Sequence, residues 1–205
     1  LSSDYNYIWD LIKKRDEKKK IIAFDISSKK KIILVSLKKK ISNSEVENLG
    51  ANFYDQFKSN KINEFNLDTD TLYNQQRNII GYFVHGIKLK SYTFEKYKTK
   101  KNNKNILITI TGKNQPSLKD KTKFRAIEDG TFYTRDLVSE PGNILHPDEY
   151  AKRLNSLRKH GLKVTVYDEK KLKKLGMNTL LGVGQGSIRG SYLVTIEWNG
   201  LGKKS

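Results

Sequence analysis

The stretch Arg135-Asp136-Leu137-Val138-Ser139-Glu140-Pro141-Gly142-Asn143 decides how this chain is organised. Residues 121–138 carry apolar side chains at helical spacing, which predicts one long helix. Residues 139–143 cannot continue that helix, because Pro141 lacks a backbone N–H and restricts the residue before it. We therefore expect a bridging helix that ends at this stretch, with a separate structural unit on either side.

On the C-terminal side, the pattern predicts short helices and two strands. Pro147 suits the first position of a helix with acidic residues in its first turn, and Gly161 suits its end after His160. The other expected elements are a strand at 162–167, an Asp168-capped helix at 169–175 stopped by Gly176, a glycine-rich turn at 177–187 and a strand at 191–198. Parallel strands joined by helices need cover on both faces, which so short a segment cannot supply. We therefore expect residues 140–205 to be the opening part of a larger α/β domain.

On the N-terminal side, alternating strands and helices predict a layered α/β domain over residues 1–112. Ser44 and Glu47 have the spacing of a capping box, and Asp70 is expected to cap a second helix. The first of these helices carries an apolar stripe of Val46, Leu49, Phe53 and Phe57. The remaining expected elements are a helix at 5–19, strands at 20–26, 31–37, 61–67 and 105–111, and a charged loop at 98–105. Residues 113–139 are then a linker and the bridging helix.

The composition excludes several classes of protein. The 205 residues include no Cys, which excludes disulfides and thiolate metal sites. No run approaches the roughly 18 apolar residues of a membrane helix, and no signal peptide is visible. These observations favour a cytoplasmic protein without membrane contact. Because the chain begins with Leu1 and ends in a short polar tail, we expect both ends to be cuts.

The net charge of +18 needs a second explanation besides nucleic-acid binding. The chain has 33 Lys against 7 Arg, beside 17 Asn, and this bias is typical of an AT-rich genome. Nucleic-acid-binding proteins also use Arg, because its planar guanidinium contacts phosphate and guanine through paired hydrogen bonds. Part of the charge is therefore interpreted as codon bias.

The glycine cluster Gly182-Val183-Gly184-Gln185-Gly186 does not fit a nucleotide-binding pattern. The pattern G-x-G-x-x-G needs a glycine where Ser187 or Arg189 stands, and it should follow a strand. We interpret these glycines as a tight connection that needs positive φ or close backbone approach. No Walker motif and no G-x-S-x-G nucleophile elbow occurs.

The histidines do not form a metal-ligand pattern, since His85, His146 and His160 have no acidic or histidine partner at ligand spacing on a common helix face. The acids that follow His146 are better explained as first-turn residues of a helix. The aromatic stretch at 92–98 could stack nucleic-acid bases, but it is more typical of a half-buried segment with its lysines in solvent. The residues alone therefore identify no catalytic, cofactor-binding or metal-binding residue.

Two further segments, Lys174-Leu175-Gly176-Met177 and Leu181-Gly182-Val183-Gly184-Gln185-Gly186-Ser187, join the opening stretch in a recognisable order. Together they resemble the leucyl aminopeptidase (cytosol aminopeptidase) family. In that family a linker helix ends in a pattern like R-D-L-V-N-x-P-x-N, and a helix ending in L-G-M leads to a V-G-Q-G-S loop. Residues 194–200 look like the family's first long strand, and residues 91–98 are similar to its Y-x-F-x-x-Y-K segment. This chain departs from the pattern at Ser139-Glu140, where many members have Asn-Thr.

The resemblance implies a macro-like N-terminal α/β domain, a linker helix and the truncated start of an α/β metallopeptidase domain. In the family, two divalent metal ions (zinc or manganese) held by a Lys and carboxylates activate water against the first peptide bond. The resemblance also implies peptide substrates and a homo-hexamer in the cytoplasm.

The family's metal ligands lie in K-G-x-x-F-D-[ST]-G-G and N-T-D-A-E-G-R motifs, and neither occurs in this sequence. The first would be expected a few residues after Ser205. No catalytic, metal or cofactor-binding residue is therefore carried over, and we expect the 205 residues to bind no metal and to be inactive alone.

Two other functions stay open. The basic N-terminal domain is compatible with weak DNA binding, which would make the affinity fall steeply with salt concentration. The macro-like domain could instead bind a nucleotide or ADP-ribose, but the glycines of residues 1–112 are isolated and form no phosphate-binding loop (Gly50, Gly81, Gly86 and Gly112).

Overall fold

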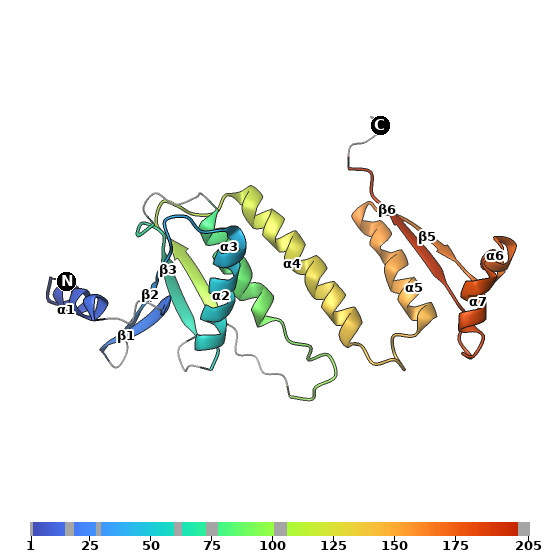
Figure 1. Cartoon of the computed structure of the whole chain (residues 1–205), viewed down its shortest axis with the longest axis horizontal. Coiled ribbons are helices and arrows are strands. Elements are labelled where there is room, and N and C mark those ends of the chain that lie inside the picture. Colours follow the sequence, from blue (N-terminus) through green and yellow to red (C-terminus); the bar gives the residue numbers. More distant parts are fainter. Residues whose placement is uncertain are drawn as a thin grey trace. The chain divides into compact units, whose positions relative to one another are not determined.

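The computed structural model describes residues 2–14, 19–27, 30–59, 63–72, 78–100 and 106–200 (Figure 1). The chain divides into two compact units, Leu1–Thr134 and Arg135–Ser205, and each is considered by itself. Within the described residues, no helix combines the length and the apolar content that crossing a lipid bilayer requires.

The first unit combines helices with two small sheets. Strands β1 (Ile21–Ser27) and β2 (Lys30–Val35) form an antiparallel hairpin, and β3 (Glu64–Asp68) pairs in parallel with β4 (Leu107–Thr111). The helices are α1 (Ser2–Lys13), α2 (Asn43–Phe57), α3 (Ile79–Ser91) and α4 (Leu118–Ser139), the last of which continues into the second unit. The predicted mixture of strands and helices is confirmed, but α1 ends at Lys13 instead of residue 19, and α3 begins later than predicted.

Helices α2 and α3 form the core of this unit, and their backbones come close to each other at two glycines. A Cβ added to Gly86 would lie 2.0 Å from the carbonyl oxygen of Glu47, and one added to Gly50 would lie 2.0 Å from that of Phe83. The buried cluster is Val46, Leu49, Phe53, Phe57, Ile79, Phe83 and Ile87, so the predicted stripe of α2 is confirmed. Apolar residues of both small sheets pack against this cluster, which joins the elements around one core.

The capping box of α2 lies two residues earlier than predicted. The Ser42 hydroxyl accepts from the Glu45 N–H at 3.3 Å, and the Ser42 N–H donates to the Glu45 carboxylate at 3.0 Å. The prediction of Ser44 and Glu47 was wrong because the pattern S-x-x-E occurs twice in succession here. The earlier start adds two residues to the helix and therefore more backbone hydrogen bonds.

Asp70 does not cap α3, which begins at Ile79 after Asn78. Its carboxylate instead accepts from the Lys113 N–H at 2.7 Å. The buried Thr69 beside it donates its hydroxyl to the Thr111 carbonyl at 2.8 Å and accepts from the Asn114 N–H at 3.1 Å. Asp70 and Thr69 thus join the segments that follow β3 and β4, and residues 73–77 lie outside the described residues.

Among its described residues, the second unit contains the end of α4, four short helices and one antiparallel pair of strands. The elements are α5 (Pro147–Asn155), a 3₁₀ helix (Ser156–His160), β5 (Lys163–Tyr167), α6 (Glu169–Lys174), α7 (Asn178–Gly184) and β6 (Leu193–Glu197). Its buried apolar side chains are Ala151, Val164 and Leu172. Asp168 caps α6 by accepting from the Lys171 N–H at 3.0 Å, as predicted, and Gly161 ends the preceding helix at φ 82°.

The expectation of parallel strands in this unit was wrong, because β5 and β6 are antiparallel from Lys163 opposite Glu197 to Tyr167 opposite Leu193. A parallel connection must return the chain along the whole strand, about 17 Å for five residues. Helices α6 and α7 have six and seven residues. At 1.5 Å per residue each spans only about 10 Å. Neither short helix alone spans the strand, and β6 enters from the end opposite to that of β5.

Candidate functional site

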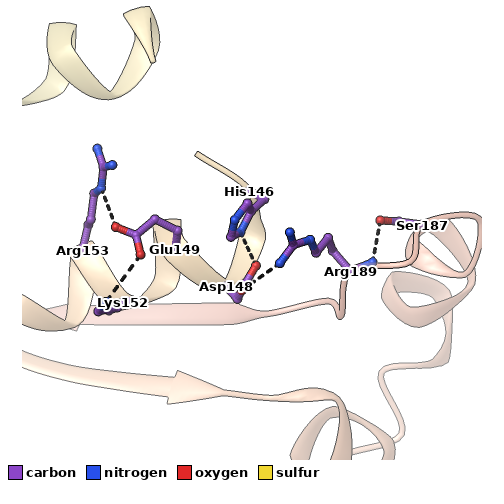
Figure 2. Close-up of polar contacts among 7 residues, drawn as sticks. All are labelled: His146, Asp148, Glu149, Lys152, Arg153, Ser187 and Arg189. Atoms are coloured by element: carbon purple, nitrogen blue, oxygen red, sulfur yellow. Dashed lines mark hydrogen bonds and ion pairs between the residues drawn. The ribbon is translucent and has the colours of Figure 1, made fainter. Parts of the chain in front are cut away.

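The densest set of charged contacts in the second unit surrounds the first turn of α5 (Figure 2). Pro147 occupies the start of the helix, and the preceding His146 has extended backbone and no capping hydrogen bond from its side chain. Instead, Nδ1 of His146 forms a close hydrogen bond with the carboxylate of Asp148. The side chain of His146 is therefore held against the helix that it precedes.

Asp148 also connects α5 to the segment that follows α7. Its second carboxylate oxygen lies 3.4 Å from Nη1 of Arg189, whose backbone N–H donates to the Ser187 hydroxyl at 3.0 Å (Figure 2). Partial desolvation raises the pKa of Asp148, but hydrogen bonds from its own N–H and from His146, with the charge of Arg189, lower it below its usual value overall. The carboxylate is thus held ionised between two basic side chains.

Glu149 and Arg153 form the second half of this set. Nε of Arg153 donates to Glu149 at 3.0 Å, and its Nη1 donates to Glu140 at 2.8 Å. The Arg153 hydrogen bond lowers the pKa of Glu149, while hydrogen bonds to Glu140 and Glu149 raise the pKa of Arg153. Only 1% of the Glu140 side chain is exposed, so this ion pair fixes the end of the 135–143 stretch to α5.

The glycine-rich segment forms a helix end and a turn. Gly182 and Gly184 belong to α7, and the Ser187 N–H donates to the Gly184 carbonyl at 3.0 Å. A Cβ on Gly184 would lie 1.9 Å from the Ser191 hydroxyl oxygen, whereas Gly182 and Gly186 face open space. The interpretation as a tight connection is therefore confirmed at Gly184 through close approach, and none of the three glycines has positive φ.

Gly176 gives the L-G-M segment that precedes α7 a structural role. It has φ 70°, its N–H donates to the Lys173 carbonyl, and the Met177 N–H donates to the Leu172 carbonyl. This pair of hydrogen bonds is a Schellman motif, which satisfies the last carbonyls of α6 and requires a left-handed residue. The segment thus has a local structural role at the end of α6.

The described residues do not fit a metal centre. Across the described part of the chain, no group of three His, Asp or Glu side chains could hold a metal ion. The carboxylates that follow His146 in sequence are those of Asp148 and Glu149, and Arg189 and Arg153 already contact them. A cation would have to displace guanidinium groups, so no ligand is assigned here.

The other candidates from the sequence lie apart from this set. His160 ends the 3₁₀ helix at the surface, and His85 is buried in the first unit with Nδ1 at 2.9 Å from Glu128. In the aromatic stretch, the ring of Tyr92 packs against Phe132 with centroids 5.3 Å apart. The three histidines are thus divided between the two units, and Tyr92 makes a ring contact within the first unit.

Sequence reasoning missed Glu140 and Arg153, the partners at the end of the 135–143 stretch. The available signal was the departure at Glu140, a charged residue where the resembling pattern has Thr. A buried acid requires a cationic partner, and Arg153 is the arginine nearest in sequence on its C-terminal side.

Two family models match the chain in succession. The description "Cytosol aminopeptidase family, N-terminal domain" matches residues 11–101, and "Cytosol aminopeptidase family, catalytic domain" matches residues 132–205. A probable cytosol aminopeptidase of Phytoplasma mali is 45% identical over 129 residues, which cover 60% of this chain and 26% of the relative. One of Agrobacterium fabrum is 43% identical over the same coverage. The chain thus spans about a quarter of the length of the curated relatives it matches.

Solved structures share the fold. The bottromycin maturation enzyme BotP in complex with Mn superposes with a TM-score of 0.72 at 18% identity, over 93% of this chain and 42% of that chain. A mutant of tomato leucine aminopeptidase superposes with a TM-score of 0.70 at 20% identity, over 86% of this chain and 37% of that chain. The predicted α/β fold class, with a partial catalytic domain, is confirmed by this likeness.

Proposed function

Because the chain belongs to the cytosol aminopeptidase family, we propose that it is the N-terminal part of a two-metal leucyl aminopeptidase, which removes N-terminal amino acids from peptides. The order of the two family models along the chain carries this proposal, since the N-terminal model precedes the catalytic one. The 45% identity to a probable cytosol aminopeptidase supports it.

We assign three parts to the chain: a macro-like domain at 1–112, a linker with the bridging helix at 113–139, and the opening of the catalytic domain at 140–205. The length of α4, Leu118–Ser139, supports a bridging role, because one helix runs past the division between the two units at Thr134. The stretch at 135–143 then forms the C-terminal end of that helix and the turn after it, which is held to α5 through Glu140 and Arg153.

We propose that residues 1–205 do not hydrolyse peptides by themselves. The family's two ligand motifs are absent from this sequence, and the described residues bring together no set of metal ligands. The two metal ions, zinc or manganese, would then be held by a part of the enzyme outside these residues. No step of the hydrolysis is assigned to a side chain of this chain.

Exposed apolar side chains of the second unit support the proposal that more protein completes the catalytic domain. Ile188 is fully exposed, and Val183 and Trp198 are about four-fifths exposed. An antiparallel pair of strands is marginally stable alone, and large exposed apolar groups mark surfaces that other protein covers. The remaining three quarters of a relative's length would supply that cover.

Location and assembly follow the relatives. The family description and the names of the relatives support a cytoplasmic enzyme, and we propose a homo-hexamer by resemblance to the family. None of the relatives reported above has a name that refers to nucleic acid. DNA binding through the basic first unit is therefore not advanced as a second function.

A chimera tests the proposal. Residues 1–200 are joined to the part of the Phytoplasma mali relative that follows its aligned region, and release of p-nitroaniline from leucine p-nitroanilide is measured with Zn²⁺ or Mn²⁺. We expect metal-dependent hydrolysis by the chimera and none by residues 1–205. The same relative's C-terminal part alone, without residues 1–200, serves as the control. A folded, metal-loaded chimera without aminopeptidase activity would contradict the proposed function.

A further inference from the structure

A pocket in the first unit lies between α3, α4 and the end of β4, apart from the contacts around α5. Its volume is about 390 Å³, and both helices and Ile110 of β4 line it. From its lining we propose that this pocket binds a small amphipathic anion, a carboxylate or phosphate monoester that carries an apolar ring or chain. The inference does not rest on the proposed aminopeptidase function.

The floor of the pocket is built from buried, mutually fixed groups. His85 is 3% exposed, and its Nδ1 lies 2.9 Å from the carboxylate of Glu128, which fixes the orientation of the ring. The His85 ring also packs against Phe124 with centroids 4.9 Å apart. Because the hydrogen bond recorded among the described residues is at Nδ1, Nε2 is the nitrogen available to a bound molecule. The floor therefore offers a polar atom that is positioned before any ligand arrives.

The aromatic wall is shaped by Gly81. A Cβ on Gly81 would lie 2.5 Å from the Phe124 ring, so the absence of a side chain lets that ring come close to α3. Phe124 and Phe132 line the pocket together with Val84 and Pro116. An apolar wall with a few polar groups is the usual composition of a small-molecule pocket of about 300–1,000 Å³. This wall suits a ring or a short aliphatic chain.

The rim carries the charge that selects an anion. Lys88, Lys121 and Arg125 line the pocket and are exposed, and no ion pair is recorded for them among the described residues. Of the two acids in the lining, Glu128 already faces His85, which leaves Asp129 against three cations. Cationic donors give charge-assisted hydrogen bonds to carboxylate and phosphate oxygens. The acidic end of the ligand would therefore meet Lys121 and Arg125 on α4, and its apolar body would meet the aromatic wall.

Titration calorimetry of residues 1–205 with phenylacetate, phenyl phosphate and uncharged benzyl alcohol tests the proposal. We expect saturable binding of at least one of the two anions, and the tighter of them identifies the acidic group. The variant K121E/R125E should weaken that binding by about tenfold or more, because it replaces two charge-assisted donors by acids. The matched control is K119E/K123E, which makes the same charge change on α4 at two positions outside the pocket lining. It should change the affinity by about twofold or less, since salt screens distant charges.

Three results would overturn the proposal. They are no saturable binding of either anion, equal affinity for benzyl alcohol, or an equal loss of affinity in the K119E/K123E control. The first removes the site, the second makes it a purely apolar cleft, and the third makes the binding a general effect of the basic surface.

Discussion

Glu140 is one of two residues, with Ser139, at which this chain departs from the pattern it otherwise resembles, and the structure shows the physical consequence. Its side chain is almost completely buried, and it accepts from Arg153 at 2.8 Å. A buried carboxylate must be paired, because the charged form is otherwise strongly disfavoured away from water. Arg153 supplies that pairing and also contacts Glu149, so one arginine joins the end of the 135–143 stretch to α5.

Replacing Arg153 by Met should destabilise the second unit by about 2 kcal/mol, because Glu140 loses a charge-assisted hydrogen bond within the protein. The measurement is hydrogen exchange of the α5 amides. The control is K152M on the same helix, since Lys152 is 82% exposed and lies 3.6 Å from Glu149. That exposed pair should contribute less than about 0.5 kcal/mol. Equal protection in R153M and the unmutated chain would show that the buried pair has no structural role.

Gly176 and Gly182 allow a second comparison at single residues. Gly176 has φ 70° in the Schellman motif, so G176A should cost about 1–2 kcal/mol. Gly182 lies within α7 with open space at its Cβ position, so G182A should be neutral or stabilise by up to about 1 kcal/mol. Denaturant midpoints of the two variants check the prediction, and it is wrong if G176A is as stable as G182A.

At the scale of elements, the packing of α2 on α3 depends on two glycines, each of which faces the backbone of the other helix. A Cβ on Gly86 would meet the carbonyl oxygen of Glu47, and one on Gly50 would meet that of Phe83. A backbone carbonyl cannot move aside as a flexible side chain can. The helices must therefore separate to admit a methyl group, and the buried cluster between them must loosen.

The variant G86A should accordingly destabilise the first unit by about 3 kcal/mol, the upper part of the usual range for overpacking. The matched control is G130A in α4, where the added Cβ meets nothing within 4 Å. That control should be neutral or slightly stabilising, because Ala is the better helix former. Thermal unfolding followed by circular dichroism separates the two, and equal melting temperatures would exclude close packing of α2 and α3.

The carboxylates in the first turn of α5 predict that the stability of this helix depends on pH. The folded pKa of Glu149 is lowered from 4.5 by the hydrogen bond from Arg153, and that of Asp148 is lowered from 3.8. A carboxylate whose pKa is lower in the folded than in the unfolded chain stabilises the fold at pH values above its unfolded pKa. This stabilisation is lost as the pH falls through the folded pKa. Hydrogen-exchange protection of the α5 amides is measured from neutral pH downwards and corrected for intrinsic exchange rates. We therefore expect this protection to decrease once the pH is lower than about 4.5. In E149Q the fall should be smaller, and an unchanged acid dependence would contradict the role of Glu149.

Elements with a local cause were predictable, and those that depend on partners were not. The Asp168 cap, the Gly161 stop and the stripe of α2 each depend on a few neighbouring residues, and each is confirmed. The capping box was misplaced because two overlapping patterns satisfy the same rule. The antiparallel pairing of β5 with β6 depends on how the segment between them folds, which the alternation of strands and helices does not encode.

The same distinction applies to the candidate site. The acids in the first turn of α5 were expected from the helix dipole, and the structure places them there. Arg189, the partner of Asp148, and Glu140, the partner of Arg153, come from segments whose approach only the folded chain shows. The pocket between α3 and α4 likewise combines residues separated by about 40 positions, so periodicity alone did not indicate it.

At the scale of the whole molecule, the chain contains two units that differ in how their apolar residues are buried. The first has its own buried core between α2 and α3. The second has few fully buried apolar residues and exposes large ones, as an opening segment of a larger domain would. The family matches follow the same order, and together with the absent ligand motifs they support the proposal that the metal ligands lie outside residues 1–205.

The most direct test is leucine p-nitroanilide hydrolysis measured side by side for residues 1–205 and for the chimera with the relative's C-terminal part. Zn²⁺, Mn²⁺ and a chelator are compared for both proteins. We predict metal-dependent release of p-nitroaniline by the chimera, loss of that release with chelator, and no release by residues 1–205. Metal-dependent hydrolysis by residues 1–205 alone would contradict this prediction.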